Sequence, residues 1–422
     1  MPEKFVSRSL RTAVTLPLVS AALVLPSTSA AAAPATSLAP AAGSQTSVST
    51  GAATAVRTAG AALKSAARPS GLPASAKGRF VSTSRLAVSA DVSMLGVTWP
   101  TTAKRVSVFV RTTQAGQKAS AWKAVGQEQG TEAAKTAGTE PTMVLGKATV
   151  EAVVLSDAPV AASLRSYGSQ VTGTDAAVAS AAAKATADSV SMRAASVTSG
   201  NATSATGVSG DAVSGKAVSI YRPTIRSRAA WRANQGLVRE PYRYGVVTGV
   251  MIHHTATSNS YTRSQVPAIL RGIQAYHVNG RGWNDIAYNV LVDKYGVAWE
   301  GRGGGLTNAV VGGHGMGITN ARVFGLSFIG NYDVKKPSSA MLDTAERVIA
   351  WKFAMHSVSV YGRTWGSSGA LNNISGHRNE KSTSCPGRYV YAKMSTIRAK
   401  VATYKQRYYS NVSAAAVRAA SR

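Results

Sequence analysis

Apolar residues in the first half of the chain recur at every second position. The clearest runs are Leu95, Val97 and Trp99; Val106, Val108 and Val110; and Val150, Ala152 and Val154. Successive side chains of a strand point to opposite faces, so this period predicts strands with one buried face. Glycine and proline residues between the runs supply turns. We therefore expect a small all-β accessory module over residues 79–166.

Two tryptophans of this module allow two interpretations. Trp99 and Trp122 either pack in or near its core or stack on the sugar rings of a ligand. We favour core packing, and the pattern leaves the module's own ligand unassigned.

From residue 221 onward the pattern alternates between strand-like and helical segments. Strands are predicted at 249–256, 286–293, 297–300 and 324–329, and helices at 263–278, 338–357 and 389–404. The first helix is indicated by apolar residues at helical spacing, such as Val266, Ile269, Leu270 and Ile273. This order predicts an α/β fold over 221–407, with a mixed central β-sheet flanked by helices.

Low-complexity sequence separates these parts. Residues 34–78 and 167–220 are dominated by Ala, Ser, Thr, Val and Gly, and 408–422 form a basic tail. Such segments bury too little apolar surface to offset the entropy of ordering them, so we expect linkers. Residues 176–187 have a composition that permits transient helix.

The N-terminus resembles a secretion signal. It has the three expected parts, namely basic Lys4, Arg8 and Arg11, an apolar run at 13–25 and a small-residue tract at 27–33. The alternative is a membrane anchor, but the run is short for a spanning helix and contains Pro17. We expect a cleaved signal peptide over 1–33, a secreted or cell-wall location and no stable membrane insertion.

The chain is strongly basic, with a formal net charge of +29. A field of this sign attracts polyanions. For an exported protein these are anionic wall polymers and membrane surfaces. The charge is scattered and forms no recognisable nucleic-acid module, so we expect no nucleic-acid partner.

Cys385 is the single cysteine of the chain, which excludes an intramolecular disulfide. Three interpretations remain: a small buried core residue, a thiol that pairs between chains, and a metal-binding or catalytic thiolate.

Histidines near Cys385 favour the third interpretation. His377 precedes the cysteine by eight residues in a turn-rich loop, a spacing that lets both side chains reach one ion. His253 and His254 lie together at a strand end, and because strand side chains alternate, one of the two faces the cleft. Two imidazoles and one thiolate leave one tetrahedral position open, as in catalytic zinc sites.

Eight short motifs occur along the chain in the order found in a known protein family. They are Ser227–Trp231, Ile252–Ala256, Gly282–Asn289, Gly296–Arg302, Gly312–His314, Gly325–Tyr332, Gly376–Arg378 and Ser384–Gly387. This pattern, over about residues 223–404, resembles the peptidoglycan recognition protein and N-acetylmuramoyl-L-alanine amidase family. The β module more loosely resembles the N-terminal region of some secreted actinobacterial amidases of this family.

The resemblance implies roles for particular residues. The metal ligands would be His253, His377 and Cys385, which selects the first histidine of the pair. Tyr288 would line the site and help to activate water or hold the oxyanion, although it is otherwise a tyrosine of the β core. Thr383 would lie beside the metal. Relatives that only recognise wall fragments tend to lack the cysteine, so its presence implies catalysis.

Substrate contacts are expected from three further residues, Trp283, His277 and His314. His277 has the alternative of capping a helix end near Asn279. The sequence departs from the family pattern at Arg232, Ala287 and Gly313, which puts substrate preference in doubt more than activity. No glutamate accompanies the ligands as in H-E-x-x-H enzymes, so the general acid or base is not assigned.

We thus expect a secreted, monomeric, zinc-dependent N-acetylmuramoyl-L-alanine amidase. Activated water would attack the carbonyl between N-acetylmuramic acid and L-alanine of peptidoglycan. One alternative is a non-catalytic recognition protein that binds peptidoglycan. Another is a charge-driven polyanion binder, whose binding moderate salt would abolish.

Overall fold

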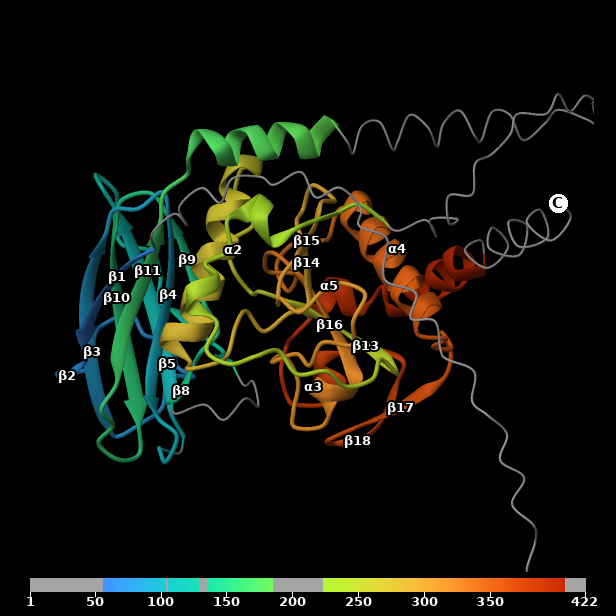
Figure 1. Cartoon of the computed structure of the whole chain (residues 1–422). Helices are drawn as coiled ribbons and strands as arrows, with labels where there is room; N and C mark the ends of the chain where they lie inside the picture. The colour runs from blue at the N-terminus through green and yellow to red at the C-terminus, as the bar shows by residue number, and fades with distance from the viewer. Residues whose placement is uncertain (1–55, 104, 129–135, 185–222, 407–422) are drawn as a thin grey trace, which may run out of the picture. The chain divides into compact units, whose positions relative to one another are not determined.

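The computed structural model describes residues 56–103, 105–128, 136–184 and 223–406 (Figure 1). The expected signal peptide, about half of the first expected linker, most of the second and the basic tail lie outside these ranges. Within the described ranges, no helix has both the length and the apolar character that crossing a bilayer requires.

Two sheets form the β module. The first has the order β1-β11-β4-β8-β7, with β9 also paired to β4, and the second has the order β2-β3-β10-β5-β6. The strands are β1 (Arg57–Ala62), β2 (Lys64–Ser65), β3 (Phe80–Val88), β4 (Val92–Pro100), β5 (Ser107–Gln114), β6 (Lys123–Val125), β7 (Gln127–Glu128), β8 (Thr136–Thr139), β9 (Thr142–Leu145), β10 (Ala148–Ser156) and β11 (Ser163–Ser169).

Apolar side chains from both sheets form one core, including those of the three runs that predicted strands. Trp99 lies in this core and is 2% exposed. Trp122 is half-buried, with the Arg111 guanidinium 4.4 Å from its ring centroid and its indole N–H donated to the Ser70 carbonyl at 3.1 Å. Both placements agree with the packing interpretation.

The module is longer than expected at both ends. Strands β1 and β2 lie in the range expected to be linker, as does the end of β11. Residues 173–184, also in an expected linker range, are helical. Strand β1 pairs along its length with β11, which fixes it through backbone hydrogen bonds although most of its side chains are exposed.

The α/β domain has a sheet of order β12-β15-β14-β16-β13-β19. Its strands are β12 (Ile225–Arg226), β13 (Gly249–His254), β14 (Val290–Val292), β15 (Ala298–Glu300), β16 (Val323–Phe328) and β19 (Ile374–Gly376). Neighbours are parallel except β14 and β15, so the expected mixed sheet is present. The strand expected at 286–293 is shorter, because 286–289 continue into the site as loop.

Helices cover both faces of this sheet. Helix α2 (Val266–Ala275) packs on one face, and α4 (Ser339–Met355) packs on the other with α5 (Arg388–Tyr391) and a helical segment at 394–406. The remaining elements are α3 (Thr319–Arg322), a hairpin of β17 (Arg363–Gly366) and β18 (Gly369–Asn372), and short 3₁₀ or π turns, among them Tyr276–Gly280.

Helix α2 is buried on all sides, not on one face alone as its pattern predicts. Its second face packs against Met94 and Tyr167 of the β module. Tyr276, directly after α2, packs on the same strand. Gly96 leaves room for its ring, since a Cβ at position 96 would lie 2.0 Å from it. Strand β4 is therefore covered on both faces, by the second sheet of the module and by α2.

Polar side chains on α2 are paired where they are buried. Arg271 is 1% exposed and binds Asp175 at 2.9 Å, the Ser169 hydroxyl at 3.0 Å and the Trp231 carbonyl at 3.1 Å. Since Asp175 lies in the helical segment 173–184, this ion pair connects that segment to the core of the α/β domain.

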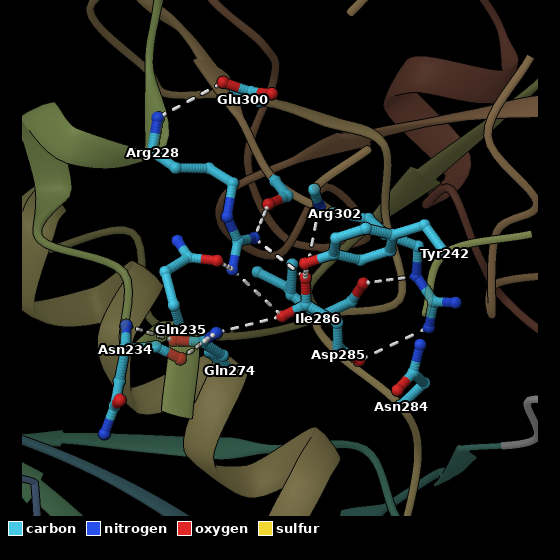
Figure 2. A network of polar contacts seen from close by, with 12 residues as sticks. Arg228, Asn234, Gln235, Tyr242, Gln274, Asn284, Asp285, Ile286, Glu300 and Arg302 are labelled. Carbon is cyan, nitrogen blue, oxygen red and sulfur yellow. Dashed lines mark hydrogen bonds and ion pairs between the residues drawn. The ribbon is translucent and has the colours of Figure 1, made fainter. Parts of the chain in front are cut away.

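A second buried network surrounds Asp285, on the loop that leads to the site (Figure 2). Its carboxylate binds Arg228 at 2.9 Å and accepts hydrogen bonds from Tyr242 at 2.9 Å and Gln274 at 2.9 Å. The backbone N–H of Gly303 donates to it at 3.1 Å. The network ties α2 to the loop segment that precedes Tyr288.

Candidate metal centre

Three side chains converge where parallel strands end. His253 lies near the carboxyl end of β13, and His377 follows β19 directly. The parallel register pairs Ile252 with Gly376, so the two histidines emerge side by side. The loop after His377 returns Cys385 to the same point. The carboxyl ends of parallel strands are where open α/β sheets usually bind ligands.

Possible ligand atoms of His253, His377 and Cys385 all lie within 4.8 Å of one another. The Cys385 sulfur is 3.6 Å from Nδ1 of His253, and the His253 and His377 ring centroids are 4.6 Å apart. The sequence pattern predicted a cluster of His377, Cys385 and one of the two adjacent histidines, and the resemblance selected His253. The structure brings His253, His377 and Cys385 together.

His314 fixes which nitrogen of His253 faces the cysteine. Its Nε2 lies 3.1 Å from the Val323 carbonyl, so this nitrogen carries the proton. Its Nδ1, 3.0 Å from Nε2 of His253, must then accept the His253 proton. The lone pair on Nδ1 of His253 is left to face Cys385. Partners of this kind set the tautomer of metal-binding histidines.

The His314 ring occupies a slot between two glycines. A Cβ at Gly312 would lie 2.4 Å from the ring, and one at Gly325 would lie 2.2 Å from it. His314 is 3% exposed, and both of its nitrogens are engaged. This arrangement gives His314 a positioning role at His253, where we had expected a substrate contact; that contact stays a prediction.

Replacing His314 by leucine should weaken zinc binding by about 10–100-fold, the usual effect of removing a residue that hydrogen-bonds to a metal-binding histidine. His314→Asn should retain more affinity, since its amide oxygen can still accept from His253. Zinc affinity is measured by competition with a chromophoric chelator. His356→Leu is the matched control, because His356 is half-buried and lies 3.2 Å from the Thr307 carbonyl. Equal affinities in all variants would contradict the positioning role.

The cysteine loop is held by backbone contacts. The N–H of His254 donates to the Cys385 sulfur at 3.4 Å, and the N–H of Arg378 donates to the Cys385 carbonyl at 2.9 Å. The Thr383 hydroxyl accepts from the Cys385 N–H at 3.2 Å. Thr383, half-buried at the pocket wall, thus shapes the loop that carries the thiol.

The chemistry of the cluster fits a zinc ion. Nε2 of His377 is buried with no hydrogen-bond partner among the described residues. Burial, and then Lys381, lower the pKa of His377 to about 4, while burial and the neighbouring histidines lower the pKa of His253 well below its usual value. Both imidazoles are therefore neutral, as metal ligands must be. Burial raises the pKa of Cys385, and a bound cation would offset that effect.

A pocket of about 480 Å³ opens over the three residues. Tyr288 lines it, with its ring centroid 5.3 Å from that of His253, and is 7% exposed. Burial raises the pKa of Tyr288 well above its usual value, so its hydroxyl stays a proton donor at neutral pH. Trp283, a predicted substrate contact, also lines the pocket.

His277 lies behind the pocket wall. It is fully buried, with Nε2 3.0 Å from a Glu128 carboxylate oxygen, while Nδ1 accepts the Ala287 N–H at 3.0 Å. Its ring packs against Trp283, with centroids 4.8 Å apart. Since both nitrogens are engaged, the structure places His277 as a support for Trp283; its expected substrate contact stays a prediction.

The sequence did not indicate that the β module lines the same pocket. Gly126, Gln127, Glu128, Glu140 and Pro141 form part of its wall. No motif marks these residues, because their proximity to the metal cluster follows from the packing of the module on α2.

Comparisons with known proteins identify the family of the α/β domain. Residues 243–388 match the family model of N-acetylmuramoyl-L-alanine amidase. Peptidoglycan-recognition protein SC1a/b of Drosophila simulans is 36% identical over 33% of this chain and 68% of the relative. Peptidoglycan recognition protein 1 of Bos indicus is 32% identical over 40% of this chain and 80% of the relative. The crystal structure of peptidoglycan recognition protein-LE with tracheal cytotoxin matches 41% of this chain and 92% of its own, with 32% identity and a TM-score of 0.35. The chain therefore belongs to the family of peptidoglycan recognition proteins and N-acetylmuramoyl-L-alanine amidases.

Proposed function

We propose that this protein is a zinc-dependent N-acetylmuramoyl-L-alanine amidase that hydrolyses the amide between N-acetylmuramic acid and L-alanine of peptidoglycan. The observation that carries the proposal is the convergence of His253, His377 and Cys385 within 4.8 Å beneath a pocket that also contains Tyr288. Two neutral imidazoles and a thiol are the donors of a catalytic zinc site with an open position.

His253, His377 and Cys385 would hold the ion. When bound, zinc supplies an acidic water molecule and a Lewis acid for the amide carbonyl. Tyr288 stays protonated and donates a hydrogen bond to the oxygen on which negative charge develops. Trp283 offers a flat apolar wall for the sugar or peptide. Thr383 holds the cysteine loop in place.

Several relatives are named as recognition proteins, so binding without catalysis is the second candidate function. The presence of all three metal-binding side chains favours catalysis, since pure recognition needs no activated water.

We further propose that the protein acts on the wall after export, which the basic and apolar order of its first 33 residues and its net charge of +29 support.

Purified peptidoglycan incubated with the mature protein should release free stem peptides, detected by mass spectrometry. Chelation should stop the release, and added zinc, but not added magnesium, should restore it, because nitrogen and sulfur ligands suit zinc. Bound zinc at about one per chain with no released peptide would support recognition instead. A protein that binds no zinc and releases peptide regardless would overturn the metal assignment.

A further inference from the structure

A carboxylate of the β module lines the pocket of the α/β domain. Glu140 lies at the short break between β8 and β9, which follow one another along β4, and its neighbour Pro141 lines the same wall. His253, Cys385 and Tyr288 line the same pocket. Two parts of the chain that are far apart in sequence therefore share one pocket.

The segment that carries Glu140 is held on the α/β domain by several contacts. The Tyr276 hydroxyl donates to the carbonyl of Thr139, the residue before Glu140. The Thr136 hydroxyl donates to the Gly280 carbonyl at 3.2 Å. The Glu140 N–H donates to the Gly126 carbonyl at 2.7 Å, which joins this segment to the next wall segment. The backbone at Glu140 is thus fixed from both sides.

The neighbouring wall segment is anchored through Glu128. Its carboxylate lies 3.0 Å from Nε2 of His277 and 3.3 Å from the Arg281 guanidinium, and its carbonyl accepts from Arg281 at 2.7 Å. Glu128 is therefore engaged in holding the module on the turn after α2.

Glu140 differs from Glu128 in having no such partner. Its carboxylate makes no hydrogen bond or ion pair with any residue in the described part of the chain. Burial, and then the charges of Glu128 and Asp333, raise its pKa to about 7. An acid with a pKa near the working pH exchanges protons most effectively in catalysis. Two further charged residues line the pocket: Lys381, on the loop after His377, and Asp333, whose carboxylate accepts the Arg388 N–H at 2.9 Å.

We propose that Glu140, supplied by the β module, is the general acid–base residue of this pocket. This inference rests on the proposed amidase function. Water forms a bond from its oxygen to the amide carbonyl carbon, and its proton passes to the Glu140 carboxylate. The protonated Glu140 then gives that proton to the amide nitrogen as the carbon–nitrogen bond breaks. The products are the carboxylic acid of the muramyl lactyl group and the free amine of L-alanine.

Other groups of the pocket are less suited to this step. Tyr288 stays protonated and so cannot accept a proton from water at neutral pH. His314 has both nitrogens engaged, and His253 and His377 are assigned to the ion. Glu380, the acidic residue between His377 and Cys385, is already bound to the Thr319 hydroxyl and the Met316 N–H.

The test compares full-length wild type with Glu140→Gln, Glu140→Ala and the control Glu240→Gln on purified peptidoglycan. Glu240 is exposed, and the residue's hydrogen bonds to Asn284 use its backbone. We expect Glu140→Gln to lower kcat by about 10²-fold or more, with KM within about threefold of wild type. Bound zinc and Tm should match wild type. The control should keep wild-type rates.

Two further readouts separate a catalytic from a structural role. The pH–rate profile of Glu140→Gln should lose the limb that reports a group titrating near pH 7, and added formate should restore part of the activity of Glu140→Ala. A kcat of Glu140→Gln close to that of an active wild type would overturn the inference while leaving the amidase function intact. A lower zinc content or Tm with no formate rescue would also overturn it, since Glu140 would then only support the fold. An inactive wild type would instead refute the amidase function, and this inference with it.

Discussion

Replacing Cys385 with serine is expected to abolish peptide release and to remove most of the bound zinc. The sulfur lies 3.6 Å from Nδ1 of His253, so the variant loses a metal donor and not merely a neighbour of one. Loss of a residue that hydrogen-bonds to a metal ligand typically weakens metal affinity by about 10–100-fold, so loss of the ligand itself should weaken it more. Zinc per chain is measured by atomic absorption after dialysis against metal-free buffer.

The reactivity of the Cys385 thiol gives an independent measurement of whether the zinc ion is bound at this residue. In wild type, bound zinc should protect Cys385 from a thiol reagent, and chelation should expose one reactive thiol per chain. The serine variant should keep its fold, because serine is close to cysteine in size and its hydroxyl can accept the His254 N–H that the sulfur accepts. A Cys385→Ser protein that keeps stoichiometric zinc and hydrolyses peptidoglycan would show that the ion, if any, is bound elsewhere.

The metal cluster was predictable because each part carries a local signal. His253 and His254 close an apolar strand, and His377 and Cys385 lie eight residues apart in one loop, so short patterns identify the cluster, while the resemblance selects His253 from the pair. The alternation of strands and helices likewise predicts the sheet on which they lie. These features depend on residues close together in the chain or on the general rule that parallel strands end at a common edge.

The contribution of the β module to the pocket was not predictable in this way. Thr139 and Tyr276, which meet in the structure, are 137 residues apart, and the contact depends on the shape left open by Gly96. Strand β1 was missed for a related reason. Its side chains are mostly exposed, and its pairing with β11 uses backbone atoms that leave no hydrophobic pattern.

His314 shows, within the site itself, that sequence patterns do not predict how a side chain is oriented. Its position in a Gly-Gly-His motif indicates that it lies close to the cleft, but it does not say which side of His253 the ring occupies. The structure places the ring behind His253, because the glycines at 312 and 325 leave a slot there and the Val323 carbonyl fixes its tautomer. Proximity to a site is thus readable from sequence, whereas the direction of a side chain is not.

Asp285→Ala is expected to destabilise the α/β domain strongly, because it breaks a buried ion pair next to the site. The carboxylate is fully buried and binds Arg228, Tyr242 and Gln274, as Figure 2 shows. Removing it leaves the Arg228 guanidinium, whose side chain is 8% exposed, as a buried charge without its partner. Breaking such a pair typically costs about 3–5 kcal/mol. The free energy of unfolding is measured by urea denaturation.

The matched control for this measurement is Asp157→Ala. Asp157 also pairs with an arginine, Arg105, at 3.3 Å, but the Asp157 and Arg105 side chains are 56% and 85% exposed. Solvent screens an exposed pair, so its loss should cost only about 0–1 kcal/mol. Similar small losses in both variants would mean that water enters the Asp285 network and compensates Arg228. A large loss confined to Asp285→Ala would instead show that the loop before Tyr288 is held by this buried pair, so that catalytic geometry and stability depend on the same residues.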